Sequence, residues 1–163
     1  MELLRKHGLK LPALFVCVVF VQSLFYKFSR SVETIYIFEE KLDPWAASLG
    51  FPGLFAPGGL FSANVVGSAE LVASLLLLFG TLAARPRIQA LGAVLGLGVI
   101  SGAIMFHLFT PLGIAVRNAD GSFDGGQLFG MACLVWLSCL AIIFVRRDEL
   151  LALIGLRRPM MLA

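Results

Sequence analysis

Charged residues are scarce in this sequence of 163 amino acids, in which Asp, Glu, Lys and Arg together make up 14%. A soluble domain normally has about 25% charged residues, so the composition excludes an ordinary soluble protein. The few charges gather in short clusters between long uncharged segments, and 59% of the residues are hydrophobic. A bilayer imposes this distribution. The net charge of +3 therefore indicates membrane topology rather than nucleic-acid binding.

Cysteine and histidine are also few, and their spacing excludes the common metal and redox motifs. The three cysteines, Cys17, Cys133 and Cys139, form no CxxC pair, and the last two would point about 120° apart on a helix. We expect them to be small apolar side chains inside the protein. Of the two histidines, His7 and His107, only the second falls in an apolar segment, so bis-histidine haem ligation has no support. The sequence predicts no metal site, and no motif identifies a catalytic residue.

Four apolar segments are each long enough to cross a bilayer, for which a helix needs about 20 residues. We predict that they form helices at about 11–29, 60–84, 88–110 and 127–145. No strand-like alternation competes with this interpretation. The fold class is therefore all-α: a polytopic membrane four-helix bundle in which residues 1–163 form a single transmembrane domain.

The distribution of Lys and Arg predicts the orientation of this bundle. Most of these residues lie in the N-terminal segment, in the turn at 85–87 and in the tail at 146–163, which all fall on one side. The loops on the other side have only Arg30, Lys41 and Arg117. Cytoplasmic loops are richer in Lys and Arg, so we expect a multi-pass protein of the bacterial cell inner membrane with both termini in the cytoplasm. Its first partner is then the lipid bilayer, and no nucleic-acid partner is expected.

The connection at 30–59 is too long for a simple turn between helices, which indicates that it has structure of its own. Its first half has apolar residues at helical spacing opposite acidic ones, and these apolar residues are Val32, Ile35, Phe38, Leu42 and Trp45. That pattern predicts an amphipathic helix on the membrane surface. The second half has the sequence GFPGLFAPGGLF, which is apolar but broken by Gly and Pro. It either dips into the membrane interface or covers the bundle, as a structural cap or as a lid over a site.

The third apolar segment has two pairs of glycines, each four residues apart. Gly92 and Gly96 form one pair, and Gly98 and Gly102 form the other. Small residues at this spacing let helices in a bilayer approach closely, and at about 100° per residue the two pairs lie on different faces. We therefore expect this helix to pack against two neighbours.

Three ionisable side chains interrupt the apolar segments: Lys27, Glu70 and His107. A charge inside a membrane helix costs about 2.5–3.5 kcal/mol on insertion scales, so it usually faces the protein interior and has a partner. One hypothesis is that Lys27 and Glu70, at similar depth, form a structural ion pair. Another is that Glu70, His107, Lys27 and Asn64 line a ligand-binding pocket that moves protons or holds a polar head group. A third is that Lys27 extends to the interface while Glu70 is protonated in lipid.

Three runs of the sequence resemble the DoxX family of small four-helix membrane proteins. They are FVQSLFYKFS, which contains Lys27, GSAELVASLLLLFG, which contains Glu70, and GVISGAIMFHLF, which contains His107. The resemblance implies a membrane subunit of a quinone-linked oxidoreductase, with a quinone as cofactor and a redox protein as partner. Two other hypotheses stay open. In the first, the protein is a non-catalytic membrane protein that binds or stabilises a partner. In the second, it is a small transporter that uses Glu70 as its coupling group.

Overall fold

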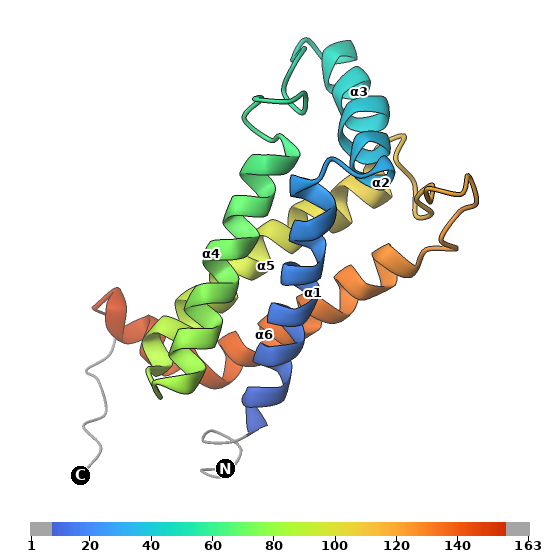
Figure 1. The fold of residues 1–163 in the computed structure, drawn as a ribbon. Coiled ribbons are helices and arrows are strands. Elements are labelled where there is room, and N and C mark those ends of the chain that lie inside the picture. The colour runs from blue at the N-terminus through green and yellow to red at the C-terminus, as the bar shows by residue number, and fades with distance from the viewer. Residues whose placement is uncertain (1–7, 156–163) are drawn as a thin grey trace, which may run out of the picture.

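Residues 8–155 are described by the computed structural model, and most of them form helices (Figure 1). The four long helices are α1 (Lys10–Phe28), α4 (Ala63–Leu82), α5 (Pro86–Phe109) and α6 (Gln127–Leu153). Each is long and apolar enough to cross a membrane. The predicted all-α four-helix membrane bundle is confirmed, and its helices are suited to contact with a lipid bilayer.

The long connections gather at one end of the bundle. Residues 29–62 link α1 to α4, and residues 110–126 link α5 to α6. Helices α4 and α5 are joined at the opposite end by a short turn at 83–85 (Figure 1). We call these two ends the loop end and the turn end.

Helix α6 continues past the expected border at 145, so residues 146–153 belong to the helix and not to a separate tail. The apolar run stops at 145, but Arg and Glu residues that follow are good helix formers. The Arg87 guanidinium of α5 lies 3.3 Å from the Glu149 carboxylate, which holds the extension against α5. Gly155, with a φ of +74°, follows the end of the helix, as is common for helix C-termini. The rest of the predicted tail, 156–163, lies outside the described residues.

The four helices share one apolar core. Helix α4 packs against α1 and α5, and α6 packs against α5 and α1. The large, fully buried side chains of this main core include those of Val16, Phe20, Leu77, Val135 and Ile142. The expectation that α5 has two neighbours is therefore confirmed.

The two glycine pairs of α5 have different surroundings. A Cβ at Gly92 would lie 2.7 Å from the backbone nitrogen of Leu77, and one at Gly96 would lie 3.3 Å from the sulfur of Cys139. A Cβ at Gly98 or Gly102 would meet no atom within 4 Å. Gly92 and Gly96 therefore lie in helix contacts, as predicted, whereas the prediction is wrong for Gly98 and Gly102. The face of α5 with Gly92 and Gly96 meets both neighbouring helices.

The first half of the 30–59 connection is helical, as predicted. Helices α2 (Val32–Ile35), the π-helix η2 (Tyr36–Leu42) and α3 (Asp43–Ser48) follow one another without a break and form one rod at the loop end (Figure 1). The predicted apolar face is wrong at one end, since Val32 is 47% exposed whereas Tyr36 is buried. A π-helix has i→i+5 hydrogen bonds, so it shifts the buried face relative to an α-helix. The position of the rod on a membrane surface stays a prediction.

A second core, the loop-end core, covers this end of the bundle. Its buried members are Tyr36, Phe38, Leu42, Ala46, Phe55, Leu112 and Val116, and Val66 of α4 and Phe106 of α5 pack against it. Asp43 of the rod accepts hydrogen bonds from the backbone N–H groups of Phe55 and Ala56, at 3.0 and 3.1 Å. These bonds fix the Gly- and Pro-rich half of the connection to the rod. On its buried side, where Phe55 enters the loop-end core, this segment therefore acts as a structural cap.

Candidate functional site

Lys27 and Glu70 meet between α1 and α4. The Nζ of Lys27 lies 3.0 Å from each carboxylate oxygen of Glu70 and also donates a hydrogen bond to the hydroxyl of Ser23, one turn earlier in α1. Lys27 is in the last turn of α1, where the helix dipole favours a cation. Only 14% of the Lys27 side chain and 6% of the Glu70 side chain are exposed. The two residues thus form a largely buried ion pair.

Polar contacts continue from the ion pair along the contact between α1 and α4. The Ser74 hydroxyl donates a hydrogen bond to the backbone carbonyl of Glu70 at 2.8 Å. The Cys17 thiol donates to the backbone carbonyl of Ser74 at 3.4 Å. Buried polar groups need partners in an apolar interior, and these groups find them on the same helix and on its neighbour. The contacts thus give the α1–α4 interface a line of paired polar groups.

His107 belongs to a different group of contacts. Its Nδ1 lies 2.7 Å from the backbone carbonyl oxygen of Gly113. A carbonyl oxygen only accepts, so Nδ1 carries the proton of this hydrogen bond. The imidazole packs edge-on against Phe129, with ring centroids 5.6 Å apart. His107 therefore joins the end of α5 to the turn after it and to α6, and no hydrogen bond or ion pair of the described chain connects it with Lys27 or Glu70.

Asn64 is separate as well. It lies in the first turn of α4 and is exposed, and its backbone carbonyl accepts a hydrogen bond from the Ser68 hydroxyl at 2.8 Å. The four residues expected to line one pocket are therefore found in three places: the ion pair, the contact of α5 with α6, and the exposed start of α4. Their role in binding a ligand stays a prediction.

A polar cluster at the turn end was missed by the sequence analysis. The side-chain nitrogen of Gln89 donates to the Thr81 hydroxyl at 2.9 Å, and its side-chain oxygen accepts a hydrogen bond from Nε of Arg146 at 2.9 Å. Gln89 is 2% exposed and joins α4, α5 and α6. The signal available in the sequence was a polar residue, Gln89, inside a helix predicted to be apolar. Its partners belong to other helices, so spacing along the sequence could not identify them.

Asp124 organises the connection between α5 and α6. Its carboxylate accepts hydrogen bonds from the backbone N–H groups of Val116, Gly126 and Leu128, at 2.8, 2.9 and 2.9 Å. Burial raises the pKa of Asp124, but these hydrogen bonds favour the charged form and together hold the pKa below its usual value. The carboxylate is therefore charged at neutral pH and caps the start of α6, where the helix dipole favours an anion.

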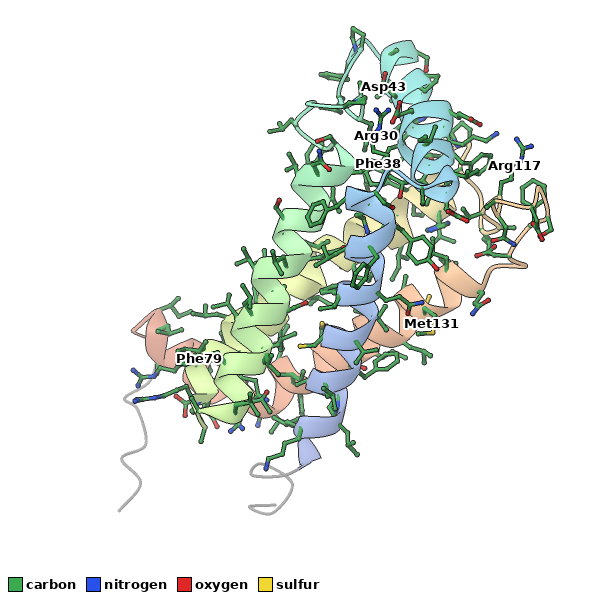
Figure 2. The ribbon with its side chains drawn as sticks, in the orientation of Figure 1. Arg30, Phe38, Asp43, Phe79, Arg117 and Met131 are labelled. Carbon is green, nitrogen blue, oxygen red and sulfur yellow. The ribbon has the colours of Figure 1, made fainter. Side chains whose placement is uncertain are left out.

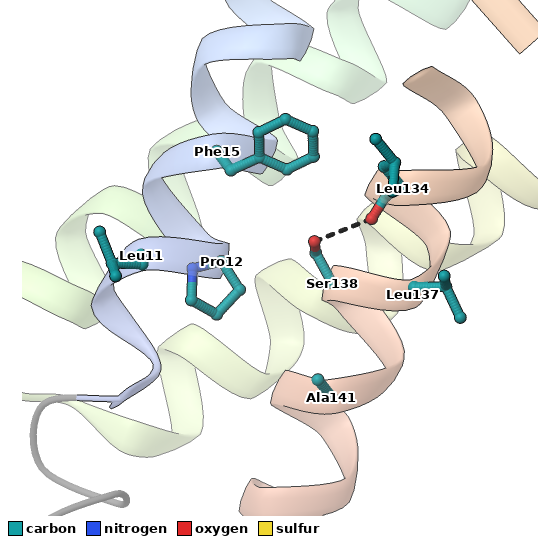
Figure 3. Close-up of a pocket in the computed structure, with 7 residues that line it drawn as sticks. All are labelled: Leu11, Pro12, Phe15, Leu134, Leu137, Ser138 and Ala141. Atoms are coloured by element: carbon teal, nitrogen blue, oxygen red, sulfur yellow. Dashed lines mark hydrogen bonds between the residues drawn. The ribbon is translucent and has the colours of Figure 1, made fainter. Parts of the chain in front are cut away.

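Open apolar grooves run along the surface of the bundle. One groove of about 490 Å³ lies between α1 and α6 (Figure 3), and its lining residues are Leu11, Pro12, Phe15, Leu134, Leu137, Ser138 and Ala141. The Ser138 hydroxyl donates to the backbone carbonyl of Leu134 at 2.8 Å, so the groove presents an almost entirely apolar surface. Neither the ion pair nor His107 lines this groove.

The cysteines of the described chain are free thiols, of which Cys17 and Cys139 are buried and Cys133 is partly exposed. Among residues 8–155, no group of three or more His, Cys, Asp or Glu side chains could hold a metal ion.

Comparisons with protein-family models, with curated proteins and with solved structures found no match to this chain. The resemblance to the DoxX family therefore stays a prediction from the sequence. The same holds for the quinone and the redox partner that the resemblance implies.

Proposed function

We propose that this protein is a non-catalytic, multi-pass protein of the bacterial cell inner membrane that binds or stabilises a partner protein, with both of its termini in the cytoplasm. The observation that carries the proposal is the ion pair of Lys27 and Glu70. One ammonium group lies 3.0 Å from both oxygens of the carboxylate. The strongest candidate for a catalytic or coupling group is thus used to hold two helices together.

The lipid-facing side of α5 is where we expect a transmembrane helix of the partner to bind. Gly98 is exposed, and a Cβ at Gly98 or at Gly102 would meet no atom within 4 Å. Glycines four residues apart let a second helix approach the backbone closely. Met105, which is 48% exposed, follows Gly98 by two helical turns and lies on the same face.

Photo-cross-linking from this face tests the proposal. With p-benzoylphenylalanine in place of Met105, native membranes should yield one protein adduct of defined mass. Gly98→Leu should abolish that adduct, because the larger side chain separates the two backbones. It should leave the fold of this chain unchanged, because the space beside Gly98 is open.

Gly130→Leu in α6 is the matched control, since a Cβ at Gly130 also meets no atom within 4 Å. This variant should retain the adduct formed at Met105. An adduct that survives Gly98→Leu, or a wild-type chain that forms none, would contradict the proposed partner site.

The groove between α1 and α6 favours a second candidate, the membrane subunit of a quinone-linked redox complex that the DoxX resemblance implies. An apolar groove open to lipid suits the isoprenoid tail of a quinone, and Ser138 is the one polar residue of its lining. Titration of a quinone analogue into the protein in nanodiscs tests this function. Leu137→Trp, which fills the groove, should weaken binding, whereas Leu78→Trp on the exposed side of α4 should not. A wild-type chain without saturable binding would favour the partner-binding function.

A further inference from the structure

The segment of residues 49–61, which we call the apolar loop, exposes large hydrophobic side chains at the loop end. Leu49, Phe51, Leu60 and Phe61 are 57%, 61%, 70% and 46% exposed. The sequence has no charged residue between Asp43 and Glu70. Clusters of exposed apolar side chains mark surfaces that contact a membrane or another molecule. An apolar partner is therefore expected to cover this loop.

The backbone of the apolar loop is suited to an apolar surrounding. Its two prolines, Pro52 and Pro57, have no N–H group to leave unpaired. Most of its other N–H groups have acceptors within the chain. Those of Leu49, Gly50 and Phe51 donate to carbonyls of α3, those of Phe55 and Ala56 to the Asp43 carboxylate, and those of Gly59 and Phe61 to carbonyls of the loop itself. Unpaired N–H groups are costly in lipid, so this pairing lowers the cost of insertion.

The apolar loop continues the lipid-facing surface of α4. Phe61 lies two residues before the start of α4, and Val65 and Val72 continue the exposed apolar surface along that helix. Asp43 is the charged residue that contacts the apolar loop, and its carboxylate accepts hydrogen bonds from the loop backbone. Two basic side chains of the loop end lie elsewhere. Arg30 pairs with Glu39 of the rod, and Figure 2 shows Arg117 in the 110–126 connection, well away from the apolar loop. A surface divided in this way is typical of segments at a membrane interface.

We propose that the apolar loop is a membrane-interface anchor, which inserts Leu49, Phe51, Leu60 and Phe61 into the boundary between lipid head groups and acyl chains. Its partner is the bilayer leaflet next to the loop end. The inference goes beyond the proposed function and does not depend on it, because no partner protein is involved and either orientation of the bundle allows it. The anchor would fix the depth of α4 in the membrane, since interfacial side chains set the position of a membrane helix.

Quenching of a single tryptophan tests the anchor. Phe51→Trp is introduced into the full chain after both native tryptophans are replaced by phenylalanine, as Trp45→Phe and Trp136→Phe. The protein is reconstituted into phosphatidylcholine vesicles with bromine on the acyl chains near the head groups. We expect the tryptophan emission to lose most of its intensity in brominated vesicles and to be protected from iodide in the water.

Phe123→Trp on the same background is the matched control. Phe123 is 59% exposed at the same end of the bundle, but it lies in a connection with Asp120 and Asp124. Its emission should be quenched by iodide and not by brominated lipid.

The anchor is overturned if Phe51→Trp behaves as the control does. Protection of Phe51→Trp from both quenchers would also overturn it, because protein and not lipid would then cover the loop. Circular dichroism checks that each variant keeps its helix content. Leu60→Trp provides the same measurement at a second position if Phe51→Trp does not fold.

Discussion

A carboxylate inside a membrane helix needs a countercharge, and Lys27 supplies it for Glu70. Burying two ions costs several kcal/mol each, and their attraction offsets this cost only when the geometry is good. Here the Nζ of Lys27 lies 3.0 Å from each carboxylate oxygen. We therefore expect the pair to add little to the net stability of the bundle. We infer that the pair mainly determines how α1 and α4 meet.

Removing one charge of this pair should destabilise the bundle by about 3–5 kcal/mol, because the other charge then stays buried without a partner. We expect Glu70→Gln and Lys27→Gln each to lower the unfolding temperature in detergent. The double variant should unfold at a higher temperature than the less stable single variant. A double variant that shows no such recovery would contradict a stabilising contact between the two charges.

The exposed ion pair of Arg30 and Glu39 is the control for this experiment. Its side chains are 56% and 29% exposed, so Glu39→Gln should cost only about 0–1 kcal/mol of stability.

The Glu70→Gln variant also tests the transporter hypothesis. Ion flux into liposomes that requires Glu70 in a folded protein would support that function.

Depth in the membrane explains which site residues could be recognised from the sequence. A pairing of Lys27 with Glu70 could be proposed because charges in the apolar segments are few and the predicted depths of these two residues are similar. The contacts of His107 with Gly113 and Phe129 were not predictable. Distance along a helix determines only one coordinate of a side chain. The rotation of each helix and the identity of its neighbours, which determine the others, follow from packing.

Helices α4 and α5 form a tight hairpin at the turn end. A Cβ at Gly80 would lie 2.3 Å from the backbone nitrogen of Gln89 and 2.6 Å from its Cα. Only a residue without a side chain allows the two backbones to come so close. The same approach places the Gln89 side chain within hydrogen-bond distance of the Thr81 hydroxyl. The glycine thus brings together the polar cluster that joins α4, α5 and α6.

Gly80→Ala should separate this hairpin and lower the stability of the bundle by about 1–3 kcal/mol, the usual cost of overpacking. Thermal unfolding in nanodiscs would measure the effect. Gly102→Ala is the control, because a Cβ at that position meets no atom within 4 Å and alanine favours the helix. A Gly80→Ala variant as stable as the wild type would contradict the tight backbone contact between α4 and α5 at this position.

The rod at the loop end shows what periodicity can and cannot predict. Apolar residues at helical spacing correctly indicated a helix in the first half of 30–59. The π-helix Tyr36–Leu42 was not predicted, and its buried side chains belong to the loop-end core. That change of register buries Tyr36 and leaves Val32 exposed. The local sequence therefore decides that a helix forms here, whereas the face that this helix buries depends on the surface against which it packs.

The molecule has two apolar cores, one between the four long helices and one beneath the connections of the loop end. The second core draws side chains from both connections. A hydrogen bond from the backbone N–H of Ala119 to the Glu33 carboxylate, at 3.1 Å, also joins the 110–126 connection to the rod. These connections are therefore structured parts of the fold, and they close one end of the bundle.

The proposed orientation places the loop end outside the cytoplasm, because the loops there are poor in Lys and Arg. A fluorescent protein fused after Ala163 should then be fluorescent in the cytoplasm. Alkaline phosphatase inserted after Gly50 should be active, since this enzyme folds only outside the cytoplasm. The same enzyme inserted after Ala84, at the turn end, should be inactive. The reverse pattern of activity would contradict the proposed orientation.

The sequence by itself determined the class of this protein: four apolar segments of sufficient length, few charges, and a lysine and a glutamate at similar depth. These properties depend on composition and on spacing along single helices, which a bilayer constrains strongly. Only the tertiary structure decided that Glu70 pairs with Lys27 while His107 does not join them, that Gly98 and Gly102 face outward, and that Gln89 links three helices. Such contacts depend on how helices rotate and pack against one another, because residues far apart in the sequence meet only after the chain has folded.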